Sequence, residues 1–195
     1  MPDPLERLLD EVRACRHCAA NLPMGPRPVL QAARSARVRI VGQAPGRKVH
    51  ESGIPWDDAS GERLRQWLGL TAAQFYDASK VAIVPMGFCY PGRAASGDLP
   101  PRPECAGLWH ARISAHLPQL GLTLLIGRYA QTHYLGRQCR PTLGETVRAW
   151  RSYLPGGFLP LPHPSPRNQP WLVANPWFTR EVLPAARRAV RAALS

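Results

Sequence analysis

The chain has 195 residues, 45% of them hydrophobic, which is enough to bury one sizeable core. Its 25 Lys and Arg residues outnumber 13 Asp and Glu, and the formal net charge of +12 favours an anionic partner such as nucleic acid. No apolar run has the length of a membrane span, and the N-terminus lacks the pattern of a signal peptide. We therefore expect a single cytoplasmic domain over residues 1–195, monomeric and without a membrane partner.

Nearly all of the positive charge is arginine, because Lys48 and Lys80 are the only lysines. Arginine contacts phosphate through a planar fork and stacks on bases, so this bias suits nucleic-acid binding. A biased genomic codon usage explains the same ratio equally well.

The predicted elements begin with a short amphipathic helix over residues 4–17, in which Leu5, Leu8, Leu9 and Val12 have helical spacing. Four apolar runs of strand length then follow at residues 38–41, 81–84, 122–126 and 158–161. Further helices are predicted over about residues 61–68, 103–117, 129–135, 143–152 and 179–194. This order predicts an α/β fold, a three-layer α/β/α domain with a central four-stranded parallel sheet.

In an open parallel sheet ligands bind beyond the carboxyl ends of the strands, so the residues that follow each strand deserve most weight. The first strand runs into Gly42-Gln43-Ala44-Pro45-Gly46, which is neither a dinucleotide fingerprint nor a P-loop. The last runs into His163, whose proline-rich loop can direct a ring nitrogen at a developing anion. Taken alone, the first loop indicates only a tight turn, and a capped loop histidine explains His163 as well as a functional role does.

Three motifs in order resemble those of the uracil-DNA glycosylase superfamily: Gly42 to Gly46, then Gly53-Ile54-Pro55-Trp56-Asp57-Asp58-Ala59-Ser60-Gly61, then His163-Pro164-Ser165-Pro166-Arg167-Asn168. The resemblance spans Cys15 to about Asn168 and is closest to the bacterial and archaeal branches that carry an iron-sulfur cluster. It implies a four-stranded parallel sheet between helices. It also implies an enzyme that flips uracil, or a related deaminated base, out of DNA and hydrolyses its N-glycosidic bond to leave an abasic site.

The resemblance also implies roles for individual residues. His163 would stabilise O2 of the departing uracil, and the loop of Gly42, Gln43, Ala44, Pro45 and Gly46 would add backbone donors. Trp56 would stack on the flipped base. Ser165, Arg167 and Asn168 would contact DNA, filling the vacated space in the stack or holding phosphate.

Two departures from the family pattern concern water activation and base reading. Some branches have a carboxylate or an asparagine in the first motif, where this chain has Gln43 and Ala44. We therefore assign Asp58 to position water and balance the oxocarbenium charge, with Asp57 in reserve. The alternative is a capping role at the helix that begins near residue 61, for which Asp58 and Ser60 are both suitable.

The second departure is Pro85, which stands where the family often has an asparagine that pairs with the uracil edge. Backbone atoms of Met86 and Gly87 are the expected substitutes, and specificity for uracil stays open. Because lysine is scarce, we expect a monofunctional hydrolase, although Lys48 leaves strand cleavage through a Schiff base open.

Four cysteines form the second strong signal: Cys15 and Cys18 in a C-x2-C pair, with Cys89 and Cys105 further along. Their spacing and position resemble those of the iron-sulfur glycosylases, which implies a [4Fe-4S] cluster; structural zinc or no metal are the alternatives. The cluster would tie the first helix to the loop over residues 85–105 and hold basic residues, including Arg93 and Arg102, against DNA. Cys139 has no partner in this pattern.

Two other classes of function remain open at this point. A non-catalytic protein that binds nucleic acid or damaged DNA would use the same fold and explain the missing carboxylate in the first motif. An iron-sulfur redox protein would use the cysteines, but it leaves the His163 loop and the basic charge without a role.

Overall fold

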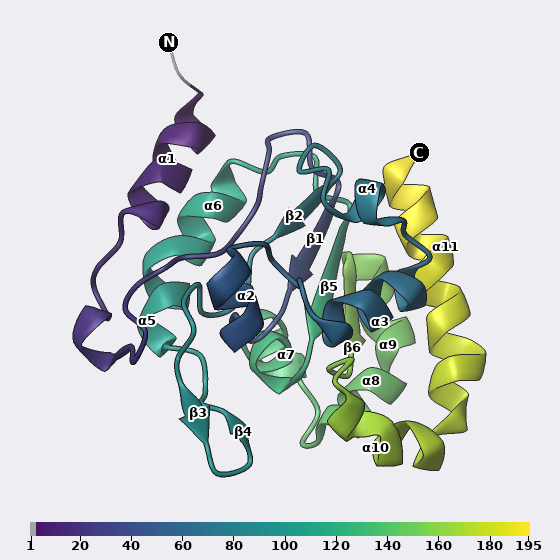
Figure 1. Cartoon of the computed structure of the whole chain (residues 1–195). Coiled ribbons are helices and arrows are strands. Elements are labelled where there is room, and N and C mark those ends of the chain that lie inside the picture. Colours follow the sequence, from purple (N-terminus) through teal and green to yellow (C-terminus); the bar gives the residue numbers. More distant parts are fainter. Residues whose placement is uncertain (1–2) are drawn as a thin grey trace.

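A computed structural model describes residues 3–195, and its centre is a sheet of four parallel strands (Figure 1). The strands are β1 (Val38–Val41), β2 (Val81–Ile83), β5 (Leu122–Ile126) and β6 (Phe158–Leu161), in the order β2-β1-β5-β6. Val38 lies opposite Val81 on one side and Leu122 on the other. Because all four strands run in one direction, the loops that follow them meet at one edge of the sheet.

One face of the sheet packs against α3 (Ala59–Leu68) and α11 (Leu183–Leu194). Val38 and Ile40 of β1 share this core with Leu64 of α3 and Val190 of α11, and all four side chains are fully buried. Two short helices, α8 (Leu143–Arg148) and α9 (Trp150–Tyr153), pack beside β6.

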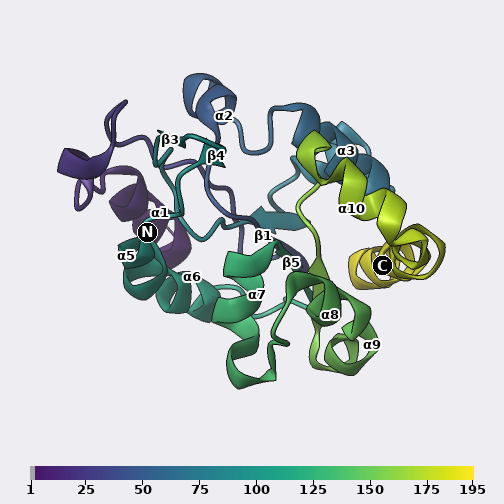
Figure 2. The same cartoon turned by 90° about the horizontal axis from the view of Figure 1, so that it is seen from below.

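The opposite face is covered by α1 (Pro4–Arg13), α6 (Ala111–Ala115) and α7 (Arg128–Leu135). Ala82 and Val84 pack with Leu9 and Ile113, whereas Leu125 packs nearer α7. Seen from below, α1, α6 and α7 lie on one side of the strands and α3 and α11 on the other (Figure 2). The predicted three-layer α/β/α fold is therefore confirmed.

Several helix boundaries differ from the prediction. The first helix ends at Arg13, before the polar stretch that contains Cys15 and Cys18. The helix predicted over residues 103–117 consists of α5 (Pro103–Cys105), a π-turn over Ala106–His110 and α6. Asp58 caps α3, which begins two residues earlier than predicted.

Three helices and one hairpin have no counterpart in the prediction: α2 (Arg47–Ser52), α4 (Ala72–Phe75), α10 (Gln169–Ala174) and an antiparallel hairpin of β3 (Arg93–Ala94) and β4 (Gly97–Asp98). They are short, and α10 has no buried residue, so apolar periodicity does not mark them. In Figure 1 the hairpin, α2 and α10 lie toward the same end of the sheet. Within residues 3–195, no helix has the length and apolar character needed to cross a membrane.

Candidate active site

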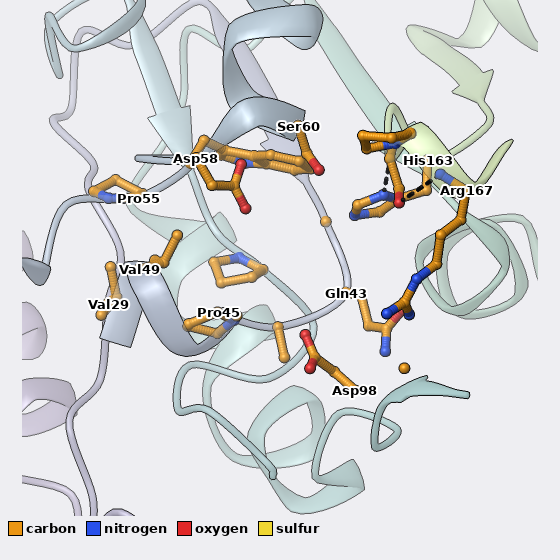
Figure 3. A pocket seen from close by; sticks show the side chains of 18 of the residues that line it. Val29, Gln43, Pro45, Val49, Pro55, Asp58, Ser60, Asp98, His163 and Arg167 are labelled. Atoms are coloured by element: carbon orange, nitrogen blue, oxygen red, sulfur yellow. Dashed lines mark hydrogen bonds between the residues drawn. The ribbon is translucent and has the colours of Figure 1, made fainter. Parts of the chain in front are cut away.

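A cavity of about 530 Å³ lies where the loops after the parallel strands meet (Figure 3). Its wall includes most of the residues predicted to form a site: Gly42, Gln43, Ala44, Pro45, Gly46, Trp56, Asp58, His163, Ser165, Arg167 and Asn168. Segments more than a hundred residues apart in sequence therefore contribute to one wall. The volume lies in the range of pockets that hold small organic ligands.

The loop after β1 depends on a glycine at its first position. A Cβ on Gly42 would lie 2.7 Å from Cζ2 of Trp56, so only glycine lets the indole ring pack this closely against the backbone. The loop is also tied to the end of β2, because Met86 N–H donates to the Gly42 carbonyl at 2.9 Å and Gly87 N–H donates to the Gln43 carbonyl at 2.9 Å.

Trp56 is held in an unusual backbone conformation. Its φ of 58° lies in the left-handed region, which is strained for a bulky residue. A Cβ on Gly61 would lie 1.8 Å from the Trp56 carbonyl oxygen, so the start of α3 also requires glycine. The ring centroids of Trp56 and His163 are 5.5 Å apart with the planes inclined at 31°. The indole thus presents a half-buried aromatic surface beside the histidine.

Asp58 has a structural contact and a place in the cavity wall. Its Oδ1 accepts the Gly61 N–H at 2.8 Å and caps α3, as its position before the helix suggested. That bond uses one of the two carboxylate oxygens, and Figure 3 shows the carboxylate pointing into the cavity. The neighbouring Asp57 is exposed and does not belong to the cavity wall.

His163 is held as a neutral donor. Burial lowers the pKa of the imidazole, and the nearby Asp58 charge opposes this only in part. Ser165 N–H donates to Nδ1 at 3.2 Å, so the hydrogen of the neutral ring is placed on Nε2. Asn168 Nδ2 donates to the His163 carbonyl at 2.7 Å and fixes the loop backbone. Asn168 therefore has a role inside the protein, in addition to the DNA contact predicted for it.

Arg167 is tied to the β3–β4 hairpin. Its Nη1 donates to the Ser96 carbonyl at 3.2 Å, and a Cβ on Gly97 would lie 2.6 Å from that nitrogen. The guanidinium thus packs closely against the hairpin backbone, although the side chain is exposed and DNA can still reach it. From the loop after β1, Gln43 Nε2 donates to the Leu99 carbonyl at 3.2 Å, directly after β4.

The hairpin adds cavity residues that the sequence analysis missed, namely Ser96, Gly97 and Asp98. The turn-forming pair Ser96-Gly97 is the sequence signal that could have indicated a hairpin here. Partial desolvation raises the pKa of the Asp98 carboxyl, and the charges of Arg167 and Arg93 oppose that rise.

Pro85 lines the cavity, whereas Met86 and Gly87 are not part of its wall. Their N–H groups are already bonded to the loop after β1, so they are not free to read a ligand. Behind Pro85, His110 is buried between two hydrogen-bond partners. Its Nε2 lies 3.0 Å from the Pro85 carbonyl, and its Nδ1 lies 2.8 Å from the Tyr134 hydroxyl. Burial lowers the pKa of His110 to about 4.

The four cysteines singled out by spacing lie together. Cys15, Cys18, Cys89 and Cys105 line one small second cavity, with Leu22, Phe88 and Trp109 in its wall. Burial raises the pKa of Cys89 and Cys105 to about 11. Within residues 3–195, no group of three or more His, Cys, Asp or Glu side chains is arranged to hold a metal ion. Cys139 lies elsewhere, 3.4 Å from Nη1 of Arg128.

Two arginines expected on a DNA-facing surface have different environments. Arg93 is exposed on the hairpin. Arg102 is half-buried, pairs with Glu104 and lines the cysteine cavity. Its charge is thus partly neutralised within the protein.

The parallel sheet and the cavity beyond its strands define the class of the protein. It is an α/β protein with a cavity at the carboxyl edge of its sheet, and His163, Asp58 and Trp56 all lie in the wall of that cavity. Comparison with known families agrees with the sequence motifs. The model of the Uracil DNA glycosylase superfamily matches residues 30–187, most of the chain, and the chain belongs to that superfamily.

Proposed function

We propose that the protein is a monofunctional DNA glycosylase that flips uracil, or a related deaminated base, into the large cavity and hydrolyses its N-glycosidic bond. The observation that carries the proposal is the meeting of three distant motifs around one cavity, with His163 and Asp58 both in its wall. Membership of the superfamily supports DNA as the substrate and base excision as the reaction class. The net charge of +12 supports binding to an anionic polymer.

His163 would stabilise the leaving base. When the bond between uracil N1 and C1′ breaks, its electron pair moves onto the base, and part of the charge reaches the O2 oxygen beside that nitrogen. A neutral imidazole with its hydrogen on Nε2 can donate a hydrogen bond to this oxygen. Trp56 beside it would stack on the ring of the flipped base.

Asp58 would act on the other side of the bond. The sugar gains positive charge as the base departs, and a carboxylate in the cavity wall stabilises that charge. Water then forms the new bond to C1′, and its proton passes to the carboxylate or to solvent while the base anion is protonated. Because the Gly61 N–H holds Oδ1, the second oxygen is the one that can face water.

The absence of a lysine from the described cavity wall supports a monofunctional hydrolase, which does not also cut the strand. Lys48 is exposed and does not line the cavity, so no amine among those wall residues is placed to form a Schiff base with the sugar. The expected product is an abasic site in an intact strand.

The test is excision from single- and double-stranded oligonucleotides that contain uracil, hypoxanthine or xanthine. We expect an abasic product that breaks only on later treatment with alkali, and we expect His163→Ala to lower kcat by about 100-fold or more. A half-buried histidine outside the cavity wall, in His116→Ala, is the matched control and should retain activity. If the protein binds these oligonucleotides but releases no base from any of them, it is a binding protein on this fold.

We also propose that the four clustered cysteines hold a [4Fe-4S] cluster. Four thiols from three separate segments line one cavity, whose other lining residues are apolar apart from Arg102, and four thiolates are the donor set that such a cluster uses. Bound there, the cluster would cross-link the segment after α1 to the loop after β2 and to α5. Its role would be to hold these segments in place, away from the bond that is broken.

Analysis of protein purified without oxygen tests this proposal. We expect about four iron and four sulfide per chain, lost in Cys105→Ser. The matched control is Cys139→Ser, which removes a thiol outside the cluster cavity and should keep the iron. Zinc, or no metal at all, in the protein purified in this way would overturn the cluster.

A further inference from the structure

The β3–β4 hairpin is bonded to two loops that line the large cavity. Arg167 donates to the Ser96 carbonyl from the side of the His163 loop, and Gln43 donates to the Leu99 carbonyl from the loop after β1. Two hydrogen bonds from different loops hold the hairpin at its turn and directly after its second strand. The hairpin is therefore part of the cavity wall, and its backbone is held there from two sides of the turn.

The hairpin brings a second carboxylate into the cavity. Asp98 Oδ2 lies 3.5 Å from the position that a Cβ on Gly46 would occupy, so it lies close to the backbone of the loop after β1. Figure 3 shows Asp58 and Asp98 entering from opposite sides of the cavity. Among residues 3–195, none forms a hydrogen bond or an ion pair with the Asp98 carboxylate. Its oxygens are thus available to a ligand.

Deamination changes the edge of a base in a way that a carboxylate can detect. In cytosine the ring nitrogen N3 is an acceptor, whereas in uracil it carries a hydrogen. The same change occurs at N1 when adenine becomes hypoxanthine. An ionised carboxylate only accepts hydrogen bonds, so it attracts the deaminated edge and repels the lone pair of the parent base.

We propose that Asp98 is the base-reading residue of this site, accepting the ring N–H that uracil and hypoxanthine have and that cytosine and adenine lack. The proposal rests on the glycosylase function proposed above and specifies how the substrate is selected. Asp98 would take over base recognition from the segment after β2. There Pro85 lines the cavity, and the N–H groups of Met86 and Gly87 are already bonded to the loop after β1. The nearby charges of Arg93 and Arg167 offset repulsion between Asp98 and the departing base anion.

The test is kcat/KM for oligonucleotides that contain uracil, hypoxanthine, cytosine or adenine. In Asp98→Ala we expect excision of uracil and hypoxanthine to fall by about 10- to 100-fold, because their N–H loses its acceptor. In Asp98→Asn we expect most uracil excision to return, because the amide oxygen accepts the same N–H. The preference for uracil over cytosine should shrink, because the amide NH₂ can donate to cytosine N3.

The matched control is Asp10→Asn, which changes an exposed carboxylate on α1, and it should leave all rates unchanged. Thermal unfolding of the Asp98 variants should match that of the unaltered protein, since the carboxylate has no hydrogen-bonded partner to lose. Unchanged excision of uracil and hypoxanthine by Asp98→Ala would overturn the base-reading role.

Failure of the proposed function would look different, because the unaltered protein would then release no base at all. In that case binding of free uracil and hypoxanthine, measured by titration calorimetry, decides the role of Asp98 alone. Weaker binding to Asp98→Ala than to the unaltered protein supports the role, and equal binding overturns it.

Discussion

Asp58 combines a capping contact and a proposed catalytic role in one side chain, and two substitutions separate them. Asp58→Ala removes the oxygen that accepts the Gly61 N–H, and loss of such a cap costs about 1 kcal/mol. In a chain of this length, 1 kcal/mol lowers the melting temperature by roughly 2–4 °C. Asp58→Asn keeps a capping oxygen, so the melting temperature should change little. Both variants lose the negative charge in the cavity, and we expect excision to fall by about 100-fold or more in each.

Single-turnover excision and thermal unfolding, measured on the same preparations, distinguish the two roles. Thr142→Ala is the matched control, because Thr142 caps α8 through the Glu145 N–H at 3.1 Å and does not line the cavity. It should lose similar stability and keep its activity. Full activity in Asp58→Asn would refute the chemical role and leave Asp58 as a helix cap.

Three further predictions concern residues that support the site. Gly42→Ala should cost about 1–3 kcal/mol of unfolding free energy and reduce excision, because the added methyl group would lie 2.7 Å from the Trp56 ring; wild-type stability would contradict this. Asn168→Ala should lower kcat more than it raises KM, since it frees the His163 carbonyl; a change in KM alone would indicate only a DNA contact. The folded protein holds His110 neutral, so its contribution to stability is present above pH 6.5 and is lost as pH falls toward about 4. Urea unfolding at several pH values should show this loss, up to about 3 kcal/mol, and His110→Gln should reduce it; an equally steep loss in that variant would assign it to other groups.

The sheet could be predicted because its strands are buried on both faces. Each strand is a short continuous apolar run, and β1, β5 and β6 have the bounds expected from the sequence. The helices on the two faces were found where apolar residues recur with helical spacing, as in α1 and α11. A helix that packs on the sheet needs apolar residues along one side, so its helical spacing can be recognised in the sequence.

The elements that were missed owe their structure to contacts from elsewhere. The hairpin pairs only Arg93 with Asp98 and Ala94 with Gly97, too few residues for an alternating pattern. Its other contacts come from Gln43 and Arg167, which are distant in sequence. Such contacts are visible only after the chain has folded, and Asp98 was overlooked for the same reason.

The cavity residues after the strands were easier to predict, because a parallel sheet brings those loops together whatever their sequences are. Gly42, Asp58 and His163 all line the cavity, as that rule and the family motifs predicted. Met86 and Gly87 follow β2 but lie outside the wall, because their N–H groups pair with the preceding loop. Position after a strand thus predicts proximity to a site, whereas contact with a ligand depends on where the hydrogen bonds go.

In the loop over Gly42 to Gly46, Gln43 has a different role from the residue that some branches of the family have at this position. Where some branches of the family have a carboxylate or an asparagine, Gln43 donates from its side chain to the Leu99 carbonyl and so holds the hairpin. That hairpin in turn presents Asp98, while Asp58 enters from the start of α3. If both proposed roles hold, the tasks of water activation and base reading are distributed over two segments outside the first motif. The Asp58 and Asp98 variants then differ in kind: the first lowers excision of every substrate, and the second changes which base is chosen.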